Sequence, residues 1–159
     1  MFREMRRKNQ LLSQSEAEEI LKNGTAGVLA LSGDDGYPYA VPMSYVYDNG
    51  RIFFHSAKSG HKTDAIESCD KASFCVIDKN DIVCDEYTTY YKSVIVFGRI
   101  HIIDNKDEII SALSVLGEKY NPGHIDDCSA EISKFINNVC VLCLEPEHIS
   151  GKAAKELIK

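Results

Sequence analysis

The stretch that decides the fold is Tyr37–Lys62, YPYAVPMSYVYDNGRIFFHSAKSGHK. It begins with a long predicted strand over Tyr37–Tyr47. Asp48-Asn49-Gly50 then gives a strong hairpin signal, because Asn and Gly tolerate the positive φ angles of a tight turn. A second strand is expected over Arg51–Ser56, and a helix over about Gly60–Ser68. The stretch therefore predicts an antiparallel hairpin whose second strand runs into a helix.

The start of that helix carries unfavourable charges. Ser59 is the expected N-cap, and a capping box would place Glu or Gln three residues later, where this chain has Lys62. The helix macrodipole makes a cation in the first turn unfavourable by a few tenths to about 1 kcal/mol, yet His61 and Lys62 both lie there. A bound anion would reverse this cost, and phosphate is the usual occupant of such a place. The alternative is that both side chains simply point into water.

The rest of the chain adds further strands and a few helices. Strands are predicted over residues 25–32, 71–78, 91–103 and 138–144, and helices over residues 15–22, 106–120 and 129–137. Residues 80–90 show no clear pattern, and Gly98 is expected at a bulge or a barrel corner. The length of the chain suits one domain over residues 1–159. Because hairpins dominate, and because a closed sheet has no exposed edges, we expect a mainly β (α+β) fold, a six-stranded antiparallel β-barrel with flanking helices.

Composition limits the possible functions. The chain has 159 residues, 44% of them hydrophobic, and a formal net charge of -6. This charge argues against general nucleic-acid binding, which relies on a basic surface. No apolar run is long enough to cross a bilayer, and no apolar segment follows the charged N-terminus. We therefore expect a cytoplasmic protein without a membrane partner.

Two of the six cysteines form a C-x-x-C. Cysteines in a cytoplasmic chain are expected to be reduced thiols, and C-x-x-C is typical of redox or zinc sites. However, Cys140 and Cys143 lie in an apolar strand, where their odd offset puts the two side chains on opposite faces. We favour two small apolar core residues over a chelating pair, and we predict no metal site.

Three features of the predicted strands are suited to binding a ligand. Pro42 has no N–H to donate to a strand ladder, so it predicts a strand edge or an opening in the sheet. Backbone groups of Met43–Tyr45 would then be free to bind a flat heteroaromatic ligand. The alternative is an ordinary edge strand with nothing bound. The aromatic run Tyr87–Ser93 suits ring stacking, and suits an oligomer interface better. His55 is a lone strand histidine, which is more often structural than catalytic, although histidine side chains in general can serve as acid or base.

Six short motifs occur in order along the chain. They are GYPYAVP at 36–42, FHSA at 54–57, GHK at 60–62, SVIVFGR at 93–99, KY at 119–120 and SGK at 150–152. Together they resemble the pyridoxamine 5'-phosphate oxidase-like flavoproteins, in particular the nitroimidazole-resistance (Nim-type) branch, from about Met5 to Lys152. The resemblance implies a split β-barrel that forms a homodimer, with FMN in two clefts between the subunits.

The resemblance also implies which residues hold the FMN. The strand from Val41 through Pro42, Met43 and Ser44 to Tyr45 would lie along the isoalloxazine ring, with Phe54, His55, Ser56 and Ala57 near the ring and the ribityl chain. His61 and Lys62 would hold the phosphate, in agreement with the charges at the helix start. Tyr90, Tyr91 and Ser93 would come from the partner subunit, and Lys152 would reach the flavin from the tail.

Two departures separate the chain from true pyridoxamine phosphate oxidases. It has His61-Lys62 where they carry an Arg-Lys pair, and Glu145–Lys159 contains no arginine-rich substrate motif. We therefore do not expect the protein to make pyridoxal phosphate. The resemblance implies an FMN-dependent oxidoreductase that passes electrons from reduced flavin to a small planar acceptor, such as a nitroaromatic, with His55 as the candidate catalytic residue. The alternatives are a non-catalytic flavin or haem carrier, with His55, His61 or His124 as the haem ligand, and a structural dimer with an empty cleft.

Overall fold

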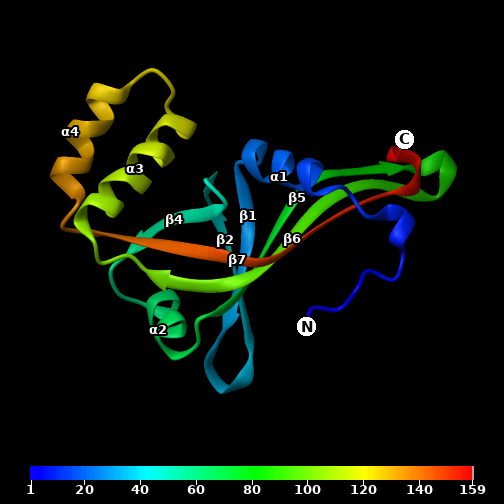
Figure 1. The fold of residues 1–159 in the computed structure, drawn as a ribbon, viewed down its shortest axis with the longest axis horizontal. Coiled ribbons are helices and arrows are strands. Elements are labelled where there is room, and N and C mark those ends of the chain that lie inside the picture. Colours follow the sequence, from blue (N-terminus) through cyan, green and yellow to red (C-terminus); the bar gives the residue numbers. More distant parts are fainter. Residues whose placement is uncertain (159) are drawn as a thin grey trace.

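One antiparallel sheet organises the protein, which we describe from a computed structural model. The structure describes residues 1–158, and all of their side chains except those of residues 125–127 and 135. Within that part of the chain the sheet has seven strands in the order β2-β1-β5-β6-β7-β4-β3. The strands are β1 (Ala26–Ser32), β2 (Pro38–Ser44), β3 (Val46–Asp48), β4 (Arg51–Ala57), β5 (Lys71–Val83), β6 (Thr88–Ile102) and β7 (Val139–Ala153). The helices are α1 (Gln14–Asn23), α2 (His61–Ser68), α3 (Lys106–Tyr120) and α4 (Ile125–Phe135), which lie around the sheet (Figure 1).

The sheet closes into a split barrel because one stretch of chain supplies both of its edge strands. β2 and β3 are separated only by Tyr45, yet they lie at opposite ends of the strand order. The predicted strand over Tyr37–Tyr47 is therefore two strands, and the sheet has seven strands where six were expected. The predicted class, a mainly antiparallel barrel with flanking helices, is confirmed. Pro42 lies in edge strand β2, paired with Val28, as its missing N–H predicts.

A side chain from α3 forms hydrogen bonds to the backbone at the break between β2 and β3. The hydroxyl of Tyr120 accepts a hydrogen bond from the Tyr45 N–H at 2.8 Å. Its single proton is shared between the carbonyl oxygens of Tyr45, at 2.7 Å, and of Thr25, at 2.5 Å. These contacts satisfy backbone groups that a strand ladder would otherwise pair, so the chain can turn from one edge of the sheet to the other.

Two hydrophobic clusters lie on the two faces of the sheet. The barrel interior contains Tyr45, Phe54 and Phe74, whose rings meet edge to face at centroid distances of 4.8 and 5.0 Å. The second cluster packs the opposite face of β4 and β7 against α3. Cys140 belongs to the interior cluster and Cys143 to the second, which confirms that the two thiols face opposite ways. All six cysteines are free.

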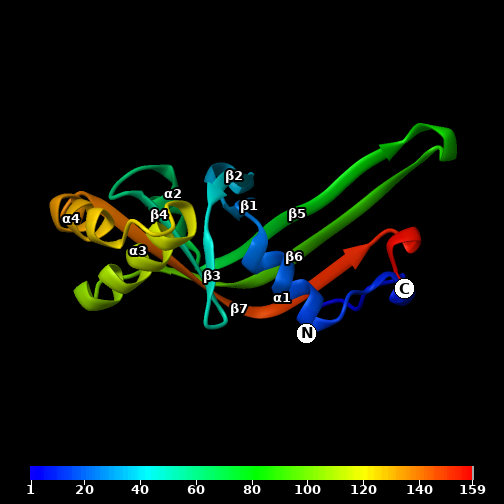
Figure 2. The ribbon, with the colours of Figure 1, turned by 90° about the horizontal axis from the view of Figure 1, so that it is seen from above.

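The strands β5 and β6 continue beyond the barrel as a long hairpin arm, with β7 beside β6 (Figures 1 and 2). The predicted strands over residues 71–78 and 138–144 are therefore too short, and residues 80–90 form the arm and its tip. Along the arm the side chains are exposed or half-buried on both faces, so the alternation that marks a strand is lost. The register shift between Phe97 and Gly98 confirms the bulge expected at Gly98.

The helices begin and end where capping residues allow. Ser13 and Glu16 form a capping box at α1, and Asn105 caps α3, whose bounds match the prediction. α4 begins four residues before the predicted helix over 129–137 and ends at residue 135. Among the helices of residues 1–158, none combines the length and the apolar character needed to cross a bilayer.

Candidate functional site

The first part of the site is the start of α2. Gly60, with φ 132°, is the N-cap, and no described side chain caps the helix. The predicted N-cap at Ser59 is therefore wrong by one residue, because glycine alone adopts this backbone conformation without strain. His61 and Lys62 consequently occupy the first two helical positions. The first turn also carries Asp64. The uncapped amide groups and the two basic side chains outnumber this one carboxylate, so the helix start favours an anion.

An aromatic contact joins this helix start to edge strand β2. The rings of His61 and Tyr39 stack at a centroid distance of 4.0 Å with an interplanar angle of 17°. His61 Nε2 also lies 3.6 Å from a carboxylate oxygen of Asp34. The Asp34 side chain is 91% exposed, so this ion pair contributes little energy. The stack is the contact that positions the imidazole beside β2.

Edge strand β2 presents two different faces. Val41 and Met43 pack against the interior cluster, whereas Ala40, Pro42 and Ser44 are exposed on the other face. The exposed face and the outer edge of β2 therefore offer a surface without bulky side chains, which a flat ligand can approach.

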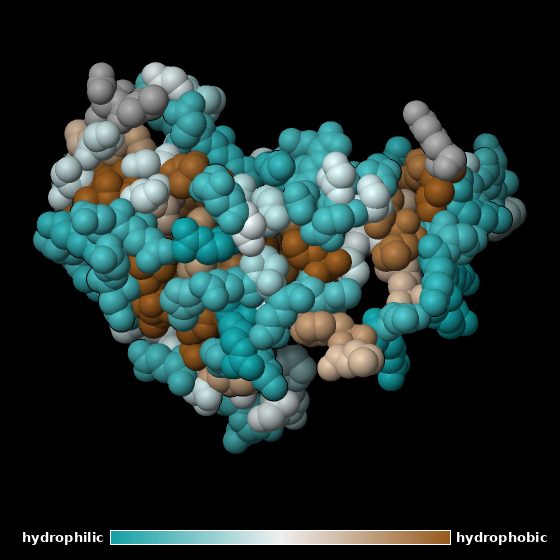
Figure 3. Space-filling view, in the orientation of Figure 1, coloured by the Kyte–Doolittle hydropathy of each residue, from teal (hydrophilic) through white to brown (hydrophobic). Residues whose placement is uncertain are grey.

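An apolar pocket of about 370 Å³ lies at the far end of β2. Ser44 and His55 line it on the barrel side. The rest of its wall comes from α3, from α4 and the residue that follows it, and from the first residue of β7: Leu113, Leu116, Gly117, Tyr120, Glu131, Ile132, Ile136 and Val139. Figure 3 shows apolar side chains between hydrophilic ones over the α3–α4 part of the molecule. The volume falls within the range of small-molecule sites.

Sequence reasoning missed the helical wall of this pocket. Of its residues, the sequence motifs include only Tyr120, and the others lie in or next to helices that were predicted without a role. The sequence does contain one indication of this wall. The apolar residues of α3 cover more of its surface than the single stripe needed to pack on the sheet. His55 is exposed toward the pocket, and its ring has no hydrogen bond to any described residue. It is thus available to a ligand and is not a satisfied structural histidine.

The remaining predicted residues near β4 differ in accessibility. Ser56 is half-buried and Ala57 exposed at the end of β4. Tyr45 and Phe54 are fully buried in the barrel, so only their backbone groups could meet a ligand. Burial also raises the pKa of the Tyr45 hydroxyl, which has no hydrogen-bond partner among the described residues. Burial lowers the pKa of Lys119, whose Nζ lies 4.3 Å over the Tyr45 ring.

A second group of predicted residues lies on the arm. Ser93 pairs with Lys152 across β6 and β7, and Lys152 Nζ lies 5.4 Å from the centre of the Tyr91 ring. The Tyr90 hydroxyl donates to Glu86 at 2.8 Å. The arm extends away from β2, β4 and α2 in both views (Figures 1 and 2). A single chain therefore gathers the predicted residues into two groups, one at the barrel and one on the arm.

The barrel group combines a cationic helix start, an open strand edge and an apolar pocket. This arrangement suits an elongated ligand with an anionic end and a flat apolar end, and it defines a split-barrel protein with a small-molecule site. A family model described as pyridoxamine 5'-phosphate oxidase matches residues 13–153. The chain belongs to this family, as the motifs indicated.

Several solved structures have the same fold. They include a flavocytochrome from Azotobacter vinelandii, with a TM-score of 0.81 and 17% identity over 95% of this chain and 72% of that one. An FAD and haem binding protein from Mycobacterium smegmatis has a TM-score of 0.79 and 20% identity over 92% of this chain and 74% of that one. A candidate 5-nitroimidazole antibiotic resistance protein from Bacteroides thetaiotaomicron has a TM-score of 0.77 and 20% identity over 90% and 86%. No curated protein matches the chain.

Proposed function

We propose that the protein is a homodimeric FMN-dependent oxidoreductase of the cytoplasm. It would pass electrons from reduced flavin to a small planar acceptor such as a nitroaromatic compound. The observation that carries the proposal is the uncapped start of α2, where His61 stacks on Tyr39 of the open edge strand β2 and Lys62 follows in the same turn. A phosphate bound there would accept bonds from backbone amides and from both side chains.

The barrel group would hold the rest of the cofactor. Val41–Tyr45 would hold the ring, and Phe54–Ala57 would hold the ring and the ribityl chain. When bound, FMN supplies the electron-transfer chemistry, and the protein supplies placement and electrostatics. His61 and Lys62 fix the phosphate end, and backbone groups of β2 orient the ring. His55 and the apolar pocket then hold the acceptor and exclude water from it.

The proposed dimer rests on the separation of the two groups and on an apolar sheet face. Val28, Cys75 and Ile95 are cross-strand neighbours on β1, β5 and β6, and Val28 and Ile95 remain 38% and 39% exposed. Exposed apolar patches of this kind mark interaction sites. A second copy seated on this face would bring the arm group of one chain, Tyr90, Tyr91, Ser93 and Lys152, toward the barrel group of the other.

A second candidate function is a haem or flavin carrier without turnover. It is favoured by His55, an imidazole without a described partner at the wall of an apolar pocket, and by the haem named for one structural relative. The discriminating measurement is steady-state reduction of the bound flavin by NADH or NADPH. Reduction followed by reoxidation with a nitroaromatic supports the oxidoreductase, whereas a flavin that is never reduced supports the carrier.

The absorbance spectrum of the protein as isolated tests the proposal first, with mass spectrometry of whatever is released on denaturation. A flavin spectrum and the mass of FMN are expected. A Soret band would favour the haem carrier. Protein that is colourless, and remains so after incubation with FMN, would contradict both functions.

A further inference from the structure

Three side chains with metal-binding atoms meet on the face of the sheet opposite the barrel interior. His101 on β6 pairs directly with Cys143 on β7, and Glu145 follows Cys143 by two residues and so shares its face. An imidazole nitrogen, the Cys143 Sγ and a carboxylate oxygen all lie within 4.8 Å of one another. None of the three takes part in the proposed FMN site.

We propose that His101, Cys143 and Glu145 bind a Zn²⁺ ion. One nitrogen, one sulfur and one carboxylate oxygen form a borderline-soft donor set that suits zinc and does not suit Mg²⁺ or Ca²⁺. Ligands of a tetrahedral zinc lie about 3.5 Å apart, given bond lengths of about 2.0–2.3 Å. Side-chain rotations that move the three ligand atoms by about 1 Å therefore complete the site, and water takes the fourth position.

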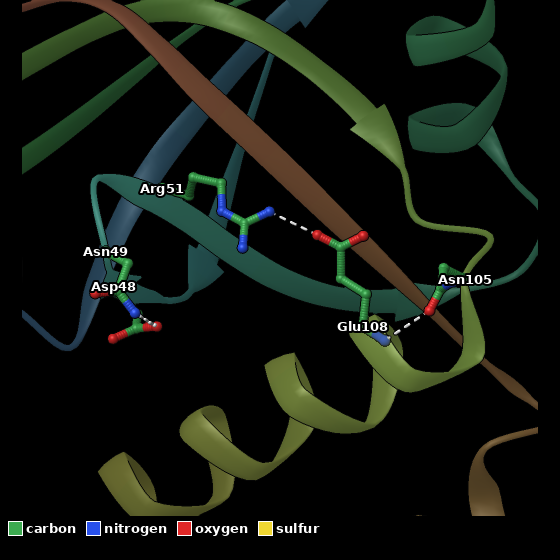
Figure 4. Close-up of polar contacts among 5 residues, drawn as sticks. All are labelled: Asp48, Asn49, Arg51, Asn105 and Glu108. Atoms are coloured by element: carbon green, nitrogen blue, oxygen red, sulfur yellow. Dashed lines mark hydrogen bonds and ion pairs between the residues drawn. The ribbon is translucent and has the colours of Figure 1, made fainter.

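The surrounding charges favour a cation in spite of two nearby arginines. The Arg51 guanidinium lies 2.6 Å from a Glu108 carboxylate oxygen (Figure 4). Arg99, which pairs with Glu145 across the strands, bonds instead to Asp70 at 2.6 Å and to Glu147 at 3.1 Å. Arg51 also lies beside the Cys143 thiol and attracts Glu145. The two arginines are thus surrounded by four carboxylates, those of Glu108, Asp70, Glu147 and Glu145, which leaves an excess of two negative charges. A divalent ion would neutralise this excess, and Arg51 would have to move away from the thiol to admit it.

Accessibility and rigidity also suit a metal site. Cys143 is fully buried beneath α3, in contact with the second cluster, whereas His101 and Glu145 are exposed. An ion can therefore enter from solvent and reach a thiol held in a packed sheet. The site differs from the C-x-x-C chelate rejected above, because Cys140 faces the barrel interior and takes no part.

Cobalt is the probe, because tetrahedral Co²⁺ reports its ligands in its absorption spectrum and replaces zinc in such sites. Chelator-treated full-length protein is titrated with Co²⁺ and then with Zn²⁺. We expect one Co²⁺ per chain, a thiolate-to-cobalt charge-transfer band in the near ultraviolet, and loss of that band when zinc is added. Cys143→Ser should abolish the band, and His101→Ala and Glu145→Gln should each weaken binding at least tenfold. The controls Cys140→Ser and His148→Ala should bind like the unaltered protein.

The exposed variants keep the test decisive even where Cys143→Ser fails to fold. A titration without a thiolate band, or equal affinity in His101→Ala, Glu145→Gln and the unaltered protein, would overturn the metal site. Neither result bears on FMN, because the metal titration needs no flavin and the FMN titration needs no metal.

Discussion

The Tyr120 hydroxyl lies within hydrogen-bond distance of both backbone polar groups of Tyr45, 2.8 Å from the nitrogen and 2.7 Å from the carbonyl oxygen. One side chain at the end of α3 therefore holds the point where edge strand β2 becomes β3. Tyr120 also lines the apolar pocket with His55. Barrel closure and the shape of the candidate acceptor pocket thus depend on the same residue.

Removing this hydroxyl should destabilise the protein. Tyr120→Phe leaves the Tyr45 N–H without its partner, so we expect the free energy of unfolding to fall by about 1–3 kcal/mol. Urea denaturation followed by circular dichroism measures the change. The matched control is Tyr45→Phe, because the Tyr45 hydroxyl is buried without a described partner and its removal should cost nothing. Equal losses in the two variants would contradict the role given to Tyr120.

The phosphate site predicts a graded response among three neighbouring basic residues. Lys62→Ala should weaken FMN binding by about 1–3 kcal/mol, the scale of a charge-assisted contact. His61→Ala should weaken it less. Lys58→Ala, which lies before the helix, should change little. Fluorescence titration of FMN measures all three, and equal effects would indicate a general electrostatic field in place of a pocket.

The proposed dimer predicts that a charge on the sheet face separates the subunits. Ile95→Lys should give a monomer in light scattering after size exclusion, and should also lose FMN because the arm group of the partner is removed. Ile110→Lys on α3 is the matched control, since Ile110 is 38% exposed and Ile95 39%. A dimeric Ile95→Lys with unchanged FMN affinity would rule out this face as the interface.

Cysteine reactivity should follow burial. Burial raises the pKa of Cys143 to about 11, so in the folded, metal-free protein its reactive thiolate is scarce at pH 8 and increases only as the pH approaches that value. Cys84 is exposed at the arm tip and should react with iodoacetamide before Cys143. Peptide mass spectrometry over a pH series measures the order. Labelling of Cys143 as early as Cys84 would contradict the packing described for β7.

Local signals in the sequence predicted much of the fold. The bounds of α3 follow from its apolar spacing and from the stop at Asn121-Pro122-Gly123, and the β3–β4 turn follows from Asn49-Gly50. The break at Tyr45 could not be predicted, because it is fixed by Tyr120, 75 residues away. The cluster of His101, Cys143 and Glu145 depends in the same way on the register between two distant strands.

In the candidate site, too, features that depend on local sequence could be predicted, and features that depend on tertiary packing could not. His61 and Lys62 were found because their charges conflict with a helix start, which is a local property. The pocket beside His55 was missed because α3 and α4 are brought to it by tertiary packing. The stack of Tyr39 on His61 likewise joins β2 to α2 through space, and no spacing in the sequence indicates it.

The most direct test of the central claim is a crystal structure of the protein with FMN bound. The account predicts that the phosphate oxygens contact Lys62, His61 and the first amide groups of α2. Phosphate oxygens bound at any other place on the molecule would contradict it.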